Sequence, residues 1–125
     1  MSIIVTSEEI AQYRTELSEY SEALVALDVL EDCEGNLEDA SISLAIQAGQ
    51  EPDTSDRWID GLAKRWRHVI CQVELKEKLE EGLQGEAITA LTASTSLPLK
   101  LATLVAIYVV RAGAESFCEP LQEKL

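Results

Sequence analysis

The sequence predicts an all-α protein, folded as a single compact bundle of about five helices. Apolar residues recur three and four positions apart in nearly every segment, which is the spacing of one helix face. The only contiguous β-branched run, Ile3-Ile4-Val5, is too short to build a sheet. The chain has 125 residues, a common size for one domain, so we expect residues 1–125 to form a single helical domain.

The first helix has a complete start signal. Thr6 is placed to cap it, and Glu9 three residues later closes a capping box. Apolar residues then follow with spacings of 3, 4, 3, 4 and 3, at Ile10, Tyr13, Leu17, Tyr20, Leu24 and Leu27. This heptad-like stripe predicts one long helix that packs along a bundle or along a second copy of the chain.

Gly35 and Asn36 mark the junction to a second helix. Glycine suits the left-handed residue after a helix end, and asparagine suits the following cap. The second helix presents Leu37, Ala40, Leu44 and Ala48 on one face, and Gly49 stops it. Residues of about 6–49 are therefore expected to form an acidic helical hairpin, and residues 50–55 a loop.

The neutral helices are expected over residues of about 55–118. The spacing predicts one helix from near Ser55 to about Glu81, a break at 82–85 and a short helix over 86–93. The last helix, about 98–117, has Pro98 in its first turn. It is apolar nearly all round over 101–110, which indicates near-complete burial. Ten residues span about 15 Å as a helix, half of a bilayer core, so a core helix is expected rather than a membrane span.

The charge is divided between the two halves of the chain. Up to Asp56 there are 14 acidic residues against the single basic residue Arg14, whereas residues 57–125 hold nine of each sign. We interpret this as one domain with a polarised surface. The candidate interaction face comprises Glu16, Glu19, Glu22, Asp28, Glu31, Asp32, Glu34, Glu38 and Asp39. A basic-aromatic stripe of Arg57, Trp58, Lys64, Arg65 and Arg67 is the candidate complement, for this chain's own acids, a second subunit or a partner.

Motifs for catalysis are missing from the sequence. It has one histidine, His68, and neither a C-x-x-C pair nor a glycine-rich loop that would bind phosphate. His68 and Cys71 lie one helical turn apart, but each falls in an ordinary packing pattern. We therefore predict no enzyme and no cofactor. The net charge of −13 also argues against nucleic-acid binding, because phosphates would be repelled.

We predict that the chain is a non-enzymatic helical protein. Its acidic face would bind the basic surface of a partner protein. One alternative is an acidic regulatory protein that binds calcium or another cation. The EF-hand pattern fails, however, because placing Gly35 at the required glycine puts Leu30 and Ser41 at ligand positions. A second alternative is an acidic mimic that blocks a basic surface. The apolar stripe of the first helix also suggests a homodimer.

Three widely spaced cysteines, Cys33, Cys71 and Cys118, do not suggest a closed disulfide framework. We expect them to be free, buried thiols in a reducing cytoplasm. The first residues lack the basic and apolar regions of a signal peptide, which agrees with a cytoplasmic location.

The segment from Asp32 to Ala40, followed by Leu44, resembles the second helix junction of ubiquitin-associated-type three-helix domains. That junction also places Gly-Asn, an acidic residue and an alanine before a short helix. The resemblance covers about a fifth of the chain and implies a short helix after Asn36. The long first helix expected here departs from that family's compact one, so ubiquitin binding is not carried over.

Overall fold

The computed structural model describes residues 4–47, 63–81, 85–95, 97–113 and 117–118. Seven helices lie within these ranges: α1 (Ser7–Glu16), α2 (Ser21–Asp32), α3 (Leu37–Gln47), α5 (Arg67–Ile70), α6 (Val73–Glu80), α7 (Gly85–Ser94) and α8 (Leu99–Ala112). Residues 63–65 are also helical, and no strand occurs in the described ranges beyond one isolated bridge between Ile4 and Asn36. The all-α prediction is confirmed, whereas the count of about five helices is wrong.

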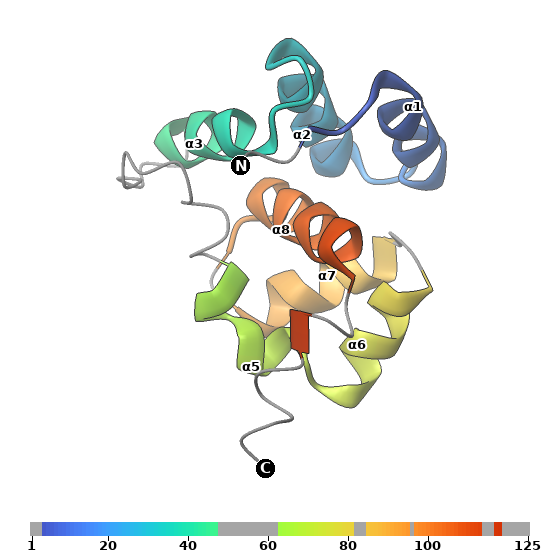
Figure 1. The fold of residues 1–125 in the computed structure, drawn as a ribbon, viewed down its shortest axis with the longest axis vertical. Coiled ribbons are helices and arrows are strands. Elements are labelled where there is room, and N and C mark those ends of the chain that lie inside the picture. Colours follow the sequence, from blue (N-terminus) through green and yellow to red (C-terminus); the bar gives the residue numbers. More distant parts are fainter. Residues whose placement is uncertain (1–3, 48–62, 82–84, 96, 114–116, 119–125) are drawn as a thin grey trace.

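The helices form three layers (Figure 1). Helices α1, α2 and α3 make one outer layer, α5, α6 and α7 make the other, and α8 runs between them. Helix α8 packs against α2, α3, α6 and α7. No described helix is long and apolar enough to cross a membrane alone. Helices α7 and α8 together reach the length and apolar composition of a membrane span, as a pair bent by 116°.

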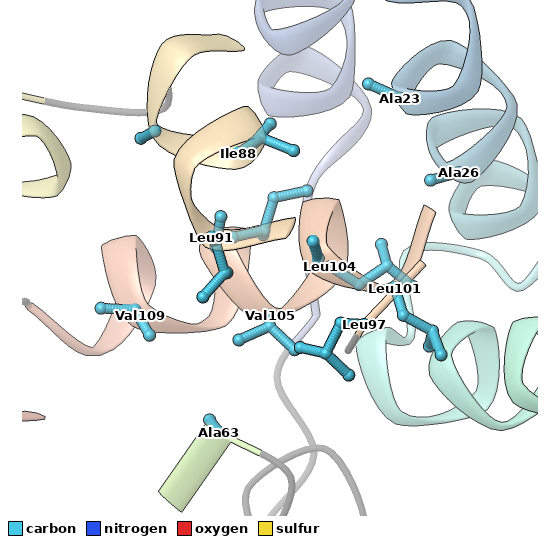
Figure 2. Close-up of a cluster of buried hydrophobic side chains, with 14 of the residues drawn as sticks. Ala23, Ala26, Ala63, Ile88, Leu91, Leu97, Leu101, Leu104, Val105 and Val109 are labelled. Atoms are coloured by element: carbon cyan, nitrogen blue, oxygen red, sulfur yellow. The ribbon is translucent and has the colours of Figure 1, made fainter. Parts of the chain in front are cut away.

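Helix α8 supplies the centre of the core. All seven residues at 101–107 are buried, including Thr103, whose hydroxyl donates a hydrogen bond of 2.8 Å to the Leu99 carbonyl. Figure 2 shows Leu101 and Leu104 of α8 together with Ala23 and Ala26 of α2 and Leu91 of α7. The short side chains of Ala23 and Ala26 let the axes of α2 and α8 approach closely. Helix α8 ends at Ala112, before Gly113 at φ 89°, so the predicted extension to about 117 is wrong.

The predicted long first helix is two helices. The chain turns at 17–20, where the Tyr20 N–H donates to the Leu17 carbonyl. Leu17 and Tyr20 still pack on the core from within the turn, so the apolar spacing continues unbroken across it. In one continuous helix Arg14 and Asp28 would lie about 21 Å apart. The turn instead brings α1 against α2, where these two side chains form an ion pair.

The shorter helices change one interpretation. The apolar stripe packs within this chain's own core, so it no longer offers a free surface for a second copy. The homodimer stays a prediction.

The helix predicted from near Ser55 to about Glu81 is also interrupted. Its start lies outside the described residues. Within them, Trp66 separates 63–65 from α5, and Cys71 and Gln72 separate α5 from α6, with Gln72 in an extended conformation. The apolar residues on both sides of this turn, Ile70 and Leu75, are buried, so periodicity again fails to mark the break. The break at 82–85 lies outside the described residues except Gly85, where α7 begins.

The local signals at the first helix and at the α2–α3 junction are confirmed. Thr6 and Glu9 form the capping box of α1. The Asn36 side chain accepts a hydrogen bond of 3.0 Å from the Asp39 N–H at the start of α3. Gly35 has φ 81°, the left-handed conformation expected after α2. The N-terminal segment lies directly on this glycine, because the Val5 N–H donates a bond of 2.8 Å to its carbonyl.

Substituting Gly35→Ala is expected to destabilise the fold by about 2 kcal/mol. The left-handed conformation costs roughly 1–2 kcal/mol for a residue with a Cβ. That Cβ would also lie 2.1 Å from the Val5 carbonyl oxygen, so the N-terminal segment would have to shift. Urea unfolding followed by circular dichroism measures the effect. The control is Glu34→Gly at the preceding position, where φ is 57°. Glycine adopts a positive φ without strain, so this change should lower the free energy of unfolding by less than about 0.5 kcal/mol. Equal losses in the two variants would contradict this explanation.

Candidate interaction face

The exposed acids of the N-terminal layer gather at the two ends of α2. Glu16, Glu19 and Glu22, here called the turn carboxylates, lie around the α1–α2 turn. Asp32, Glu34 and Asp39, here called the junction carboxylates, lie around the α2–α3 junction. All six are exposed, and none forms an ion pair within the described residues. Helix α2 has 12 residues, so its two ends lie about 18 Å apart.

Two further acids of the candidate face, Asp28 and Glu31, pair with Arg14, the only basic residue of the first 56 residues. Arg14 donates to Asp28 at 2.6 Å and to Glu31 at 2.5 Å, which joins α1 to α2. The hydrogen bond to Asp28, aided by Glu31, raises the pKa of Arg14 above its ordinary value. Asp28 and Glu31 remain exposed, and the single positive charge of Arg14 offsets one of their two negative charges. The six turn and junction carboxylates therefore carry most of the uncompensated negative charge of the face.

Glu38 does not belong to the exposed face. Its side chain is only 6% exposed, on the face of α3 that also carries the buried Ser41 and Ala45. Positions three and seven residues apart share one side of a helix, and this side of α3 faces inward. The prediction of Glu38 as a contact residue is therefore wrong.

Arg111, at the end of α8, is a cation of the neutral half that pairs with the acidic half. It donates to Glu9 at 2.8 Å and to the Ile4 carbonyl at 3.2 Å. Burial alone would raise the pKa of Glu9, but the hydrogen bonds from Thr6 and the charge of Arg111 outweigh it and lower the pKa. The sequence gives no sign of this pair, because Arg111 and Glu9 lie 102 positions apart.

The Glu9→Gln variant is expected to weaken the acid dependence of stability. The lowered pKa of Glu9 means that its contribution is present above the unfolded pKa, roughly 4.3, and is lost as the pH falls through the lower folded value. Glutamine can still serve the capping box, so the change isolates the charge. Urea midpoints between pH 7 and pH 2.5 measure it. The control is Glu8→Gln in the same turn. If both variants lose stability to the same extent as the pH falls, the role of Glu9 is contradicted.

The basic-aromatic stripe is not one uniform surface. Arg57 and Trp58 lie outside the described residues. Lys64 and Arg65 are exposed, whereas Arg67 is partly buried with its guanidinium 4.8 Å from the centre of the Phe117 ring. Trp66 packs on the core, and its ring stacks with that of the exposed His68, with the ring centres 6.2 Å apart. Arg67 therefore contacts an aromatic ring of its own chain, and its part in the basic-aromatic stripe stays a prediction.

The cysteines differ from the expectation of three free thiols. Cys71 and Cys118 form a disulfide with their Cα atoms 5.6 Å apart. Cys33 is free and partly buried at the end of α2. Burial, together with the negative charges of Asp39 and Asp32, raises the pKa of the Cys33 thiol. The expectation of free thiols therefore holds for Cys33 alone.

Three surface hollows are lined by described residues. One of about 370 Å³ lies between the N-terminal segment and the α2–α3 junction, at Ile4, Thr6 and Glu34. Another of about 440 Å³ lies between α6 and α7, at Glu77 and Glu86, and a third of about 160 Å³ lies at the start of α8. The groups whose pKa is shifted (Glu9, Tyr13, Arg14 and Cys33) line none of them.

The described residues hold no group of three or more His, Cys, Asp or Glu side chains placed to bind a metal ion. The cation-binding alternative therefore has no assembled site within the described part of the chain, and it stays a prediction. Comparison of the chain with protein-family models, with curated proteins and with solved structures finds no match.

Proposed function

We propose that this protein works without catalysis, by binding a partner protein with a basic surface through the turn and junction carboxylates. One observation carries the proposal. Arg14 is the only basic residue of the first 56 residues, and its guanidinium is held between Asp28 and Glu31. The first 56 residues therefore have no other basic side chain of their own with which to offset their exposed acids.

The position of these acids supports binding rather than folding as their role. All six are exposed residues of the outer layer that α1, α2 and α3 form with their connecting turns (Figure 1). Like charges gathered on one surface repel one another, so they do not stabilise the fold. A complementary positive surface would relieve this repulsion, increase the rate of encounter and set the orientation of the complex.

The proposal is tested by affinity capture of partners from the native lysate with charge-reversed variants. The test variant changes Glu16, Glu19 and Glu22 to Lys. The matched control changes Glu77, Glu80 and Glu81 of the neutral half to Lys, which alters the net charge of −13 by the same amount. We expect partners captured at low salt by the wild type and the control to be lost by the test variant, and their capture to weaken steeply between about 50 and 300 mM salt.

Two outcomes would contradict the proposal. Equal loss in the test and control variants would show that net charge, and not the acidic face, governs the capture. Capture that does not depend on salt would point to an apolar interface instead. Circular dichroism of both variants checks that they remain folded.

A further inference from the structure

The disulfide fastens the end of the described chain to the outer layer formed by α5, α6 and α7. Cys71 lies in the turn between α5 and α6, and Cys118 lies 47 residues further along the chain. Figure 1 shows residues 117 and 118 as a short red element beside α5 and α6. Phe117 is 6% exposed and Cys118 is 1% exposed. We name these two residues, with their bond to Cys71, the clasp.

Phe117 joins two helices that are far apart in sequence. Its ring lies under the Arg67 guanidinium of α5 at 4.8 Å and meets the Tyr108 ring of α8 edge-on at 6.2 Å. The Nε atom of Arg67 is buried and makes no hydrogen bond among the described residues. The ring face compensates part of this loss, because it attracts a cation. The contacts of Arg67 therefore depend on Phe117 staying in place.

The two sulfur-bearing residues differ in their access to solvent. Cys118 is buried, whereas Cys71 is partly exposed in its turn. A reductant in solution must attack a sulfur atom directly, so Cys71 is the accessible end of the bond.

We propose that the Cys71–Cys118 disulfide is a thiol–disulfide exchange site for a dithiol reductant, and that its reduction releases Phe117 from α5 and α8. One thiolate of the reductant attacks the Cys71 sulfur, and Cys118 leaves as a thiolate that takes up a proton. The second thiol of the reductant then attacks the mixed disulfide and frees Cys71. The protein gains two thiols and two electrons, and the dithiol becomes a disulfide.

The release is expected to be local because four other helices hold α8. Helix α8 packs against α2, α3, α6 and α7, and its residues 101–107 are buried. Phe117 and Cys118 belong to the same buried cluster, and the ring contacts of Phe117 are with Arg67 and Tyr108. Tyr108 directly follows residues 101–107 and is only partly buried. Reduction therefore exposes the rings of Phe117 and Tyr108 and the Arg67 guanidinium, while α8 keeps its place. The oxidised and reduced proteins would present two different surfaces beside α5.

The test compares oxidised and reduced protein in a Cys33→Ser background, so that only the clasp thiols react. Native protein is treated with dithiothreitol without denaturant, and thiols are counted with a chromogenic reagent. Amide hydrogen exchange is followed by NMR at Phe117 and Leu104. We expect two new thiols at low millimolar dithiothreitol, an exchange rate at Phe117 at least tenfold higher, and little change at Leu104. Reoxidation should restore both measurements.

Three outcomes would overturn the proposal. Reduction only in denaturant would make the bond purely structural. Unchanged exchange at Phe117 would show that the clasp holds without the bond. Equal acceleration at Leu104 would mean that the whole bundle opens. The Phe117→Ala variant gives a second measurement that leaves the disulfide intact: it should make the bond reducible at lower dithiothreitol, and unchanged reducibility would contradict the coupling.

Discussion

Reduction of the Cys71–Cys118 disulfide is expected to lower the free energy of unfolding by about 4 kcal/mol. The bond joins residues 47 positions apart, and closing a loop of that length restricts the unfolded chain by about this amount. Small domains commonly have a total stability of roughly 5–15 kcal/mol, so the loss would be a large fraction of the whole. Urea unfolding with and without dithiothreitol measures it.

Two variants separate the bond from general effects of the reductant. The Cys71→Ala and Cys118→Ala double variant should unfold at the midpoint of the reduced wild type and should not respond to dithiothreitol. Cys33→Ala should keep the full response, because Cys33 takes no part in the bond. A wild-type midpoint that is the same in both conditions would contradict the predicted contribution.

The Leu104→Ala substitution is expected to destabilise the protein by about 4 kcal/mol. Leu104 is fully buried in α8, with residues of both outer layers around it (Figure 2). Truncation of a leucine at such a site loses its transfer free energy and leaves a cavity that the neighbouring helices cannot fill, at a cost of roughly 2–5 kcal/mol. Denaturant unfolding followed by circular dichroism provides the measurement.

The control for the core is Ile46→Ala on α3. Ile46 is 62% exposed, so its truncation should change stability by less than about 0.5 kcal/mol. A loss at Leu104 as small as that at Ile46 would mean that α8 is not the centre of the bundle. It would also remove the basis for a local release of the clasp, which assumes that α8 stays in place.

Local signals in the sequence predicted local structure well. Thr6 with Glu9, and Gly35 with Asn36, act through atoms only a few residues apart, so their spacing alone determines the hydrogen bonds that they form. Apolar periodicity predicted which residues are buried but not where helices break. Leu17 packs into the core from a turn as readily as from a helix, so the stripe runs through the α1–α2 break without a visible change.

Contacts between distant parts of the chain could not be read from the sequence. The Arg111–Glu9 ion pair and the disulfide depend on how the layers fold over α8, and nothing in the spacing of these residues brings them together. The acidic face stays a prediction. The structure was needed to find that Arg14 pairs with Asp28 and Glu31 and that Glu38 is buried, which leaves the other six acids of the face at the two ends of α2.

The central claim concerns which carboxylates meet the partner, and zero-length crosslinking tests it most directly. A carbodiimide joins a carboxylate to a lysine amine only where the two are in contact, so treatment in the native lysate followed by mass spectrometry identifies the contacting acids. We predict crosslinks from Glu16, Glu19 or Glu22, or from the junction carboxylates, to lysines of one partner protein. Crosslinks that come instead from Glu74, Glu77 or Glu86 of the neutral half, or no crosslinked partner at all, would contradict the proposed function.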